Sequence, residues 1–283
     1  MHYKHIKSVL TGALITALLL TGCKGDTIVD PHAGQIQVLY GSDGWVWVDE
    51  QKNVPVSDFT EEDFTSDGQY MRYTGTDYTA AYGIDVSEHQ NNIDWAQVAD
   101  SGVEFVMIRS GYRGSTEGQL YIDSYFRENI EGALANGLAV GVYFFSQATT
   151  EAEAVAEADY VIAQLKEYSD RITMPVVYDW EQTGMDDART VELPAEQITA
   201  CAEKFCSTIA QAGYTPGVYF NRHMGYYFFD FTNLSQYVLW FAGEGDYPDF
   251  HYRHNMWQYT FKGEIPGIDG EVDLDLYLTP AEE

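Results

Sequence analysis

Met174-Pro-Val-Val-Tyr-Asp-Trp-Glu181 has the pattern of a buried strand that ends at a pair of acids. A proline precedes a run of β-branched and aromatic residues, which is typical of a parallel strand covered on both faces. Side chains alternate along a strand, so Asp179 and Glu181 point to the same side, roughly 6.5–7 Å apart along the chain. Carboxyl groups held this close repel each other and compete for protons.

The acid pair has two interpretations. One carboxyl can stay protonated while its neighbour is ionised, and glycoside cleavage needs this combination of an acid and an anion. Alternatively, the two acids are solvated side chains in a turn. The second interpretation is favoured for an isolated Asp-x-Glu, because the pattern is common in acidic proteins. The rest of the chain must decide between them.

Strand-like runs recur from Tyr82 to the end of the chain, and amphipathic segments separate the first five. Residues 150–168 open with the capping-box pattern Thr150-Glu-Ala-Glu153, and Pro194 suits the first turn of a helix over 194–212. Repeated strand and helix imply a parallel sheet, and eight strands favour a closed barrel over a doubly wound sheet. The last three lie close together, which predicts an irregular barrel there. The expected strands are 82–86, 105–110, 138–145, 174–178, 217–220, 238–242, 256–259 and 272–276.

Four acids fall where an active site is expected in such a barrel, at the carboxyl ends of its strands. Asp85 lies near the end of the first strand, Asp179 and Glu181 end the fourth, and Asp273 lies in the last. We therefore expect four acids from three strands to meet at one mouth.

Three aromatic residues accompany the acids. Tyr143 and Phe145 share one side of the third strand, and Trp240 lies in the sixth. Their rings would offer flat apolar faces to sugar rings, although an aromatic residue in a barrel strand is by default part of the core.

Residues 1–22 have the pattern of an export signal: a basic start, an apolar run from Val9 to Leu20 that is too short to span a bilayer, and small residues at the end. The ending Leu-Thr-Gly-Cys23 resembles a bacterial lipobox, which implies cleavage before Cys23 and a lipid on its sulfur; an ordinary secretory signal is the alternative. We expect the mature protein outside the cytoplasm, at a bacterial cell surface and anchored to the membrane.

Residues 23–80 are expected to form an acidic tether, followed by a catalytic barrel over 81–283. Two alternating runs, 36–40 and 45–48, flank a Gly-Ser-Asp-Gly turn within the tether and predict a β-hairpin, so that the barrel carries a small N-terminal β extension.

The composition excludes one class of partner. The formal net charge of the 283-residue chain is −29, and nucleic-acid binding relies on a basic surface. Cys201 and Cys206 are expected to stay unpaired, because positions i and i+5 lie on different faces of a helix. The only close histidine pair, His251 and His254, has no cysteine or acid cluster to complete a metal site.

An ordered set of motifs over roughly residues 82–278 resembles glycoside hydrolase family 25, the Ch-type lysozymes. These motifs are Tyr82-Gly-Ile-Asp-Val-Ser-Glu-His-Gln90, Ile93-Asp-Trp95, Phe105-Val-Met-Ile-Arg109, Gly141-Val-Tyr-Phe-Phe145, Asp179-Trp-Glu181, Leu239-Trp-Phe-Ala242, Trp257-Gln-Tyr-Thr260 and Gly270-Glu-Val-Asp273. The resemblance implies a modified TIM-like β/α barrel. It also implies cleavage of the β-1,4 bond between N-acetylmuramic acid and N-acetylglucosamine in the glycan strands of peptidoglycan.

The resemblance also implies roles for matching residues. Glu181 would be the general acid. Asp179 would stabilise the positively charged sugar, directly or by orienting the acetamido group of the substrate. Asp85 and Asp273 would maintain the charge pattern of the cleft. No cofactor or metal is implied, and a monomer is expected. The residues expected to bind substrate are Tyr143, Phe145, Trp240, Gln258 and Arg109.

The sequence departs from the family at two positions: Asn91 replaces a common glycine, and Asp275 replaces a usual asparagine. The extra carboxyl of Asp275 is expected to raise neighbouring pKa values. Two other functions remain open at this stage, a non-catalytic glycan-binding lipoprotein on the same barrel and a glycosidase for a different polymer.

Overall fold

The computed structural model describes residues 30–41 and 44–281. The expected signal segment and Cys23 lie outside the described residues. Every element discussed below lies in one compact unit that begins at Gly34. Within the described ranges, no helix has both the length and the apolar character that a membrane crossing requires.

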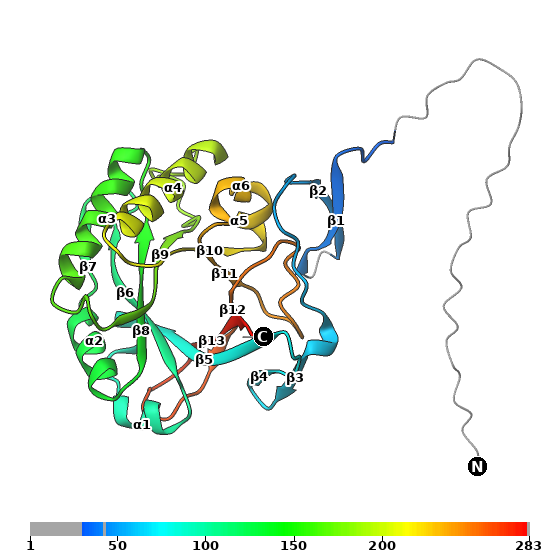
Figure 1. Ribbon diagram of the computed structural model, residues 1–283. Coiled ribbons are helices and arrows are strands. Elements are labelled where there is room, and N and C mark those ends of the chain that lie inside the picture. The colour runs from blue at the N-terminus through cyan, green and yellow to red at the C-terminus, as the bar shows by residue number, and fades with distance from the viewer. Residues whose placement is uncertain (1–29, 42–43, 282–283) are drawn as a thin grey trace, which may run out of the picture. The chain divides into compact units, whose positions relative to one another are not determined.

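A nine-stranded sheet forms the centre of this unit (Figure 1). Its order is β5-β13-β12-β11-β10-β9-β8-β6-β7, and β5 also pairs with β6, so eight strands close into a barrel and β7 extends from β6. The strands are β5 (Tyr78–Val86), β6 (Phe105–Arg113), β7 (Leu120–Ile122), β8 (Ala139–Ser146), β9 (Ile172–Trp180), β10 (Pro216–Asn221), β11 (Val238–Ala242), β12 (Met256–Gly263) and β13 (Val272–Pro280).

Helices connect the parallel strands and lie outside the barrel (Figure 1). The Thr150 hydroxyl caps α3 by accepting a hydrogen bond from the Glu153 N–H, and Pro194 precedes the first residue of α4, as predicted. The helices are α1 (Trp95–Asp100), α2 (Phe126–Ala135), α3 (Glu151–Leu165), α4 (Ala195–Gln211), α5 (Arg222–Tyr227) and α6 (Phe231–Leu234), with short 3₁₀ turns η2 (Glu61–Asp63) and η3 (Glu88–Gln90).

The eight strands expected from the sequence are present and form a closed barrel. Its irregularity lies at the end, where β13 runs antiparallel to both β12 and β5. Asp273 lies in the last strand, as predicted, and is close to its start. Because β13 is reversed, its second residue, Asp273, lies directly opposite Asp85 near the carboxyl end of β5.

Alternation along the strands separates two apolar clusters. A small one fills the barrel interior and includes Phe105, Met107, Val177 and Trp240, whereas a larger one packs between the barrel and its surroundings. Gly83 makes room inside, because a Cβ there would lie 2.3 Å from the Phe105 ring. Apolar side chains therefore fill the interior of the barrel, and a cavity is left at its mouth.

The segment before the barrel forms two hairpins. The predicted one is present as β1 (Gln35–Leu39) and β2 (Trp45–Asp49), and a second, not predicted, joins β3 (Phe64–Asp67) to β4 (Tyr70–Tyr73). Gln51 then ties the chain to the barrel unit, because its side chain donates to the Phe229 carbonyl at 2.8 Å and accepts from the Phe231 N–H at 2.7 Å.

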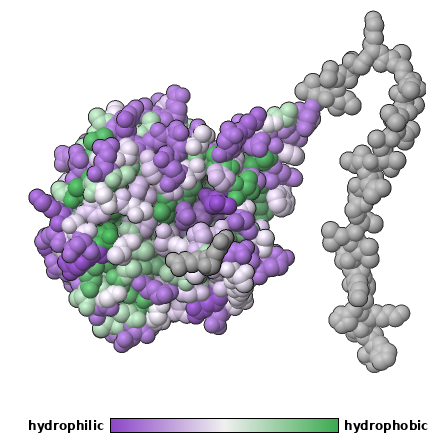
Figure 2. Space-filling view, viewed as in Figure 1, coloured by the Kyte–Doolittle hydropathy of each residue, from purple (hydrophilic) through white to green (hydrophobic). Residues whose placement is uncertain are grey.

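The surface of the protein is largely hydrophilic on the face that Figure 2 draws, and its two described cysteines are buried. On the face drawn in Figure 2, hydrophilic residues gather along the edges, and apolar residues form smaller patches between them. Cys201 and Cys206 are both buried in α4 and unpaired, as expected from their spacing.

Candidate active site

A cavity of about 280 Å³ at the mouth of the barrel brings the four predicted acids together. Asp85, Asp179, Glu181 and Asp273 all line it, although they lie up to 188 positions apart in the chain. The other residues of its wall are Tyr143, Tyr219, Trp240, Gln258 and Phe261.

The register of the sheet explains this convergence. Asp179 shares its side of β9 with Val177, which belongs to the interior cluster, so its carboxyl also faces inward. Tyr219 on β10 lies opposite both Asp179 and Trp240. The strands β9, β10 and β11 thus bring Asp179, Tyr219 and Trp240 to the same level of the barrel.

Asp85 lies at the centre of a buried polar network. The Gln258 amide donates to Asp85 Oδ2 at 2.6 Å and accepts from the Tyr219 hydroxyl at 2.8 Å. Trp240 Nε1 donates to Asp275 Oδ1 at 2.9 Å, and the Asp275 carboxyl is in hydrogen-bonding contact with Asp85. Two aromatic residues of the wall are therefore held by the same network as the acids.

Burial raises the pKa of all three aspartates in this network. The pKa of Asp85 lies well above its ordinary value, first because of burial and then because of the charges of Asp273 and Asp275. Burial also raises the pKa of Asp275 well above its ordinary value. The pKa of Asp273 rises to about 6 through burial, while a hydrogen bond with Asp85 opposes the rise. The effect expected of the extra carboxyl at Asp275 is thus present at Asp85.

Asp179 and Glu181 form the second acidic pair. Burial, and then the charge of Glu181, raises the pKa of Asp179 well above its ordinary value, while the positive charge of Arg109 opposes this. Burial, and then the charge of Asp273, raises the pKa of Glu181. Because ionisation of one carboxyl raises the pKa of the other, the pair retains a proton over a wide pH range. Asp179 is only 4% exposed, and its Oδ1 accepts no hydrogen bond from the described residues.

Arg109 and Phe145 do not line the cavity. The Arg109 guanidinium donates from Nε to Asp123 Oδ2 at 2.7 Å and from Nη2 to Glu88 Oε1 at 3.0 Å, so it acts on the site through its charge. Phe145 lies opposite Asp179 in the pairing of β8 with β9, beyond Tyr143 on the same strand. Tyr143, Trp240 and Gln258, the other three residues expected to bind substrate, are all in the wall.

Sequence reasoning missed Tyr219 and Phe261. Tyr219 has a signal, because it occupies the third position of an expected strand whose neighbours carry Asp179 and Trp240. Phe261 has none, because the pairing of β12 with β13 shifts register between Gln258 and Thr260, and simple alternation fails there. Among the described residues, no group of three histidines, cysteines or acids is placed to hold a metal ion.

A closed barrel with carboxyl groups and aromatic faces around one cavity has the chemistry of a glycoside hydrolase that uses two carboxyl groups. The chain belongs to glycosyl hydrolases family 25, whose model matches residues 84–268. The match covers all the strands that carry the site except β13 with Asp273.

Curated relatives agree with this family. The chain is 29% identical over 198 residues to the autolytic lysozyme of Clostridium acetobutylicum, a match that covers 68% of this chain and 54% of that protein. It is 27% identical over 209 residues to lysozyme M1 of Streptomyces globisporus, covering 71% and 69% respectively. It is also 27% identical over 206 residues to the uncharacterised protein YegX of Escherichia coli, covering 71% of each.

Among solved structures, the chain is similar to the modular autolysin LytC of Streptococcus pneumoniae in complex with a synthetic peptidoglycan ligand. The TM-score is 0.64 at 26% identity, over 86% of this chain and 56% of that one. The chain therefore spans little more than half of LytC and of the clostridial lysozyme. A family 25 glycosyl hydrolase from Bacillus anthracis, 20% identical with a TM-score of 0.56, shares the fold.

Proposed function

We propose that this protein is a muramidase that hydrolyses the β-1,4 bond between N-acetylmuramic acid and N-acetylglucosamine in peptidoglycan. The observation that carries the proposal is the single cavity lined by Asp85, Asp179, Glu181 and Asp273, in a chain of family 25. Relatives that are lysozymes or an N,O-diacetylmuramidase support the same substrate class.

Glu181 is the general acid of this proposal. It is the more exposed carboxyl of the central pair, and its pKa is raised by burial and by the charge of Asp273. A raised pKa keeps the proton on the carboxyl at the pH where it is needed. Glu181 gives this proton to the glycosidic oxygen as the bond to the anomeric carbon breaks.

Asp179 carries the negative charge that stabilises the sugar as positive charge develops on it. The positive charge of Arg109 opposes the rise in the pKa of Asp179 and is not among the causes that shift the pKa of Glu181, so it favours the ionised form of Asp179 specifically. Asp179 Oδ1 has no hydrogen-bond partner among the described residues, so it is available to a donor on the substrate, such as the acetamido N–H. Attack by the acetamido oxygen and attack by the carboxylate are both compatible with this role.

The remaining groups shape the cavity. Asp85 and Asp273 place hydrogen-bonding groups opposite the pair, and Gln258 fixes the orientation of Asp85. The rings of Tyr143 and Tyr219 meet Trp240 edge to face, with centroids 6.1 Å and 5.0 Å away, and together they form an aromatic wall for a sugar ring.

Glu181→Gln tests the proposal directly. The amide keeps the shape of the side chain but has no acidic proton, so kcat on purified peptidoglycan should fall by a factor of about 10²–10⁴. Release of reducing sugars measures the rate, and mass spectrometry of the products identifies the bond that is cut.

Near-normal turnover by Glu181→Gln would show that another group supplies the proton. If the unmodified protein bound glycan strands without cutting them, a binding function on the same barrel would replace the proposed activity. Glu192→Gln, in the loop between β9 and α4 and outside the cavity, is the matched control and should leave turnover unchanged.

Action outside the cytoplasm follows from this substrate, because peptidoglycan lies there. The lipid on Cys23 and the resulting membrane anchor stay predictions from the sequence. Labelling with a radioactive fatty acid, compared between the parent protein and Cys23→Ala, measures that modification.

A further inference from the structure

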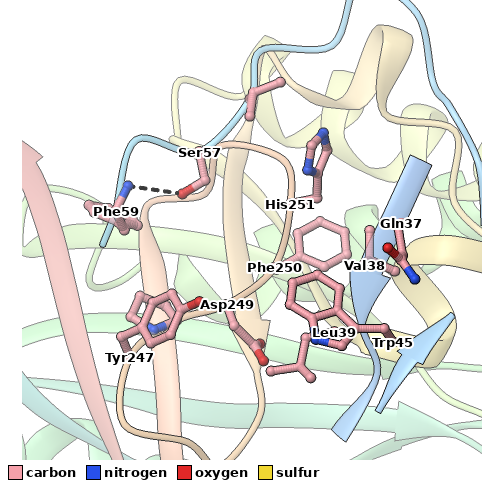
Figure 3. Close-up of a pocket in the computed structure, with 12 residues that line it drawn as sticks. Gln37, Val38, Leu39, Trp45, Ser57, Phe59, Tyr247, Asp249, Phe250 and His251 are labelled. Carbon is pink, nitrogen blue, oxygen red and sulfur yellow. Dashed lines mark hydrogen bonds between the residues drawn. The ribbon is translucent and has the colours of Figure 1, made fainter. Parts of the chain in front are cut away.

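A second cavity, of about 290 Å³, lies where the β1–β2 hairpin meets the segment that follows β11 (Figure 3). It has nearly the same volume as the catalytic cavity. Gln37 and Trp45 come from the hairpin, and Tyr247, Asp249 and His251 come from the segment. The hairpin lies outside the residues matched by the family model, so the family alone does not account for this cavity.

The wall of this cavity offers an aromatic surface. Trp45 is 65% exposed, although its indole is one of the largest apolar side chains of the hairpin. Tyr247 is half-buried and lines the same cavity (Figure 3). Flat, partly exposed aromatic faces bearing a polar group are suited to ligands that are apolar on one side and hydrophilic at the edge, as pyranose rings are.

Polar groups with fixed orientation complete the wall. Arg222 donates to Asp249 Oδ1 from Nε at 2.8 Å and from Nη2 at 2.5 Å, and this ion pair fixes the carboxyl. Burial lowers the pKa of His251, so its imidazole is neutral and offers both a donor and an acceptor. A few fixed polar groups beside apolar faces are the usual composition of a small-molecule site.

The hairpin is held firmly enough to present a binding surface. Val38 and Val48, on its inner side, are each only 3% exposed. The Tyr40 hydroxyl is 2.7 Å from His223 Nδ1 in α5, and Gln51 ties the chain after β2 to α6. The backbone that carries Trp45 is therefore already in place before a ligand binds.

Segments around the second cavity are joined directly, along the chain, to strands of the catalytic site. Arg222 starts α5 directly after β10, and the segment with Tyr247 leaves β11 after Ala242. Tyr219 and Trp240, near the ends of these two strands, line the catalytic cavity. The chain that builds the second cavity thus begins where two strands of the catalytic site end.

We propose that the cavity between the β1–β2 hairpin and the segment after β11 is a second saccharide site, which holds a sugar ring of the same glycan strand outside the catalytic cavity. The proposal rests on the proposed function, because that function makes a glycan the occupant. An acidic polymer is disfavoured by the net charge of −29, and a folded protein domain does not fit a cavity of about 290 Å³.

The first test measures binding without turnover. In the Glu181→Gln protein, Trp45→Ala should weaken binding to insoluble peptidoglycan about three- to tenfold in a sedimentation assay, because one aromatic face is lost. Trp45→Tyr, which keeps a ring, should retain most of the affinity and so exclude loss through misfolding. Tyr121→Ala, which removes a 37%-exposed ring on β7 outside both cavities, is the control and should bind as the parent does.

The second test compares substrates of different length. In the active protein, Trp45→Ala should raise KM for polymeric peptidoglycan more than KM for a soluble tetrasaccharide of the same repeat, because a short chain has few rings to place outside the catalytic cavity. Equal effects on both substrates, or unchanged binding in the first test, would overturn the second site. If the protein cut no glycan but Trp45→Ala still weakened binding, the proposed hydrolysis would fail and the saccharide site would stand.

Discussion

Arg109 provides the positive charge that opposes the effect of burial on the pKa of Asp179. Its guanidinium is held by Asp123, whose side chain is fully buried, and by Glu88. Asp123 Oδ2 also accepts the backbone N–H of Glu88, so the cation and the turn after β5 are fixed by the same carboxyl. The charge therefore has a defined position relative to the end of β9.

Replacement of Arg109 should move the pH profile of the reaction. In Arg109→Gln the pKa of Asp179 rises further, so the anion forms only at higher pH, and the acid limb of kcat/KM shifts upwards. Arg109→Lys, which keeps the positive charge, should bring the acid limb part of the way back to its position in the unmodified protein. Rate measurements from pH 4 to 8 decide the matter, and an unmoved acid limb would contradict the role given to Arg109.

The same change has a structural cost that can be measured separately. Arg109→Gln leaves buried Asp123 without its charged partner, which should lower the free energy of unfolding by about 3–5 kcal/mol. Arg127→Gln is the control, because Arg127 is 65% exposed in its ion pairs and its loss should cost at most about 1 kcal/mol. Denaturant unfolding gives both values.

At the level of elements, the hairpin and the chain after it depend on a few hydrogen bonds to the barrel unit. Gln51→Ala removes the donor to the Phe229 carbonyl and the acceptor for the Phe231 N–H. Partly buried backbone groups left unpaired should cost about 1–3 kcal/mol of unfolding free energy, measured by urea denaturation. Gln236→Ala, an exposed glutamine with one local bond, should change it by less than about 0.5 kcal/mol. Equal losses of unfolding free energy in the two variants would show that the hydrogen bonds of Gln51 do not stabilise the protein more than an exposed glutamine does.

The barrel strands were predictable from the sequence because each is a short apolar run between turn residues. The direction of β13 was not, because alternation is the same in either direction along a strand. The β3–β4 hairpin was also missed, since only Phe64 of its eight strand residues is buried and it lacks an alternating apolar pattern.

The site was predictable to the extent that it follows alternation and strand order. Asp85 and Asp179 are inward positions at strand ends, and the sequence placed them together. Phe145 and Arg109 were expected to bind substrate, but neither lines the cavity, and contacts with Asp123 and Glu88 fix the Arg109 guanidinium elsewhere. Long-range contacts of this kind leave no local signal in the sequence.

For the molecule as a whole, buried acids make stability depend on pH. The pKa values of Asp85, Asp179 and Asp275 lie well above their ordinary values, and those of Asp273 and Glu157 reach about 6 and about 7. The folded state therefore binds more protons than the unfolded state. Stability is fully present below the unfolded pKa of about 4 and is lost as the pH rises through 6–7. Repulsion within a chain of net charge −29 acts in the same direction.

The melting temperature should accordingly be higher at pH 5 than at pH 8, by roughly 5–10 °C, as calorimetry at constant ionic strength can measure. Asp275→Asn should reduce this difference, because the amide oxygen still accepts the Trp240 N–H and the protein has one buried carboxyl fewer to ionise. A melting temperature that rises from pH 5 to pH 8 would show that the buried acids do not govern stability.

The reversed strand β13 also decides at which step of folding the site becomes complete. The barrel closes only when β13 enters between β5 and β12, and Asp273 reaches Asp85 in the same step. A folding intermediate in which β13 is still unpaired has neither a sealed sheet nor a complete set of acids in its cavity. Catalytic competence therefore arrives with the final pairing of the sheet and not before it.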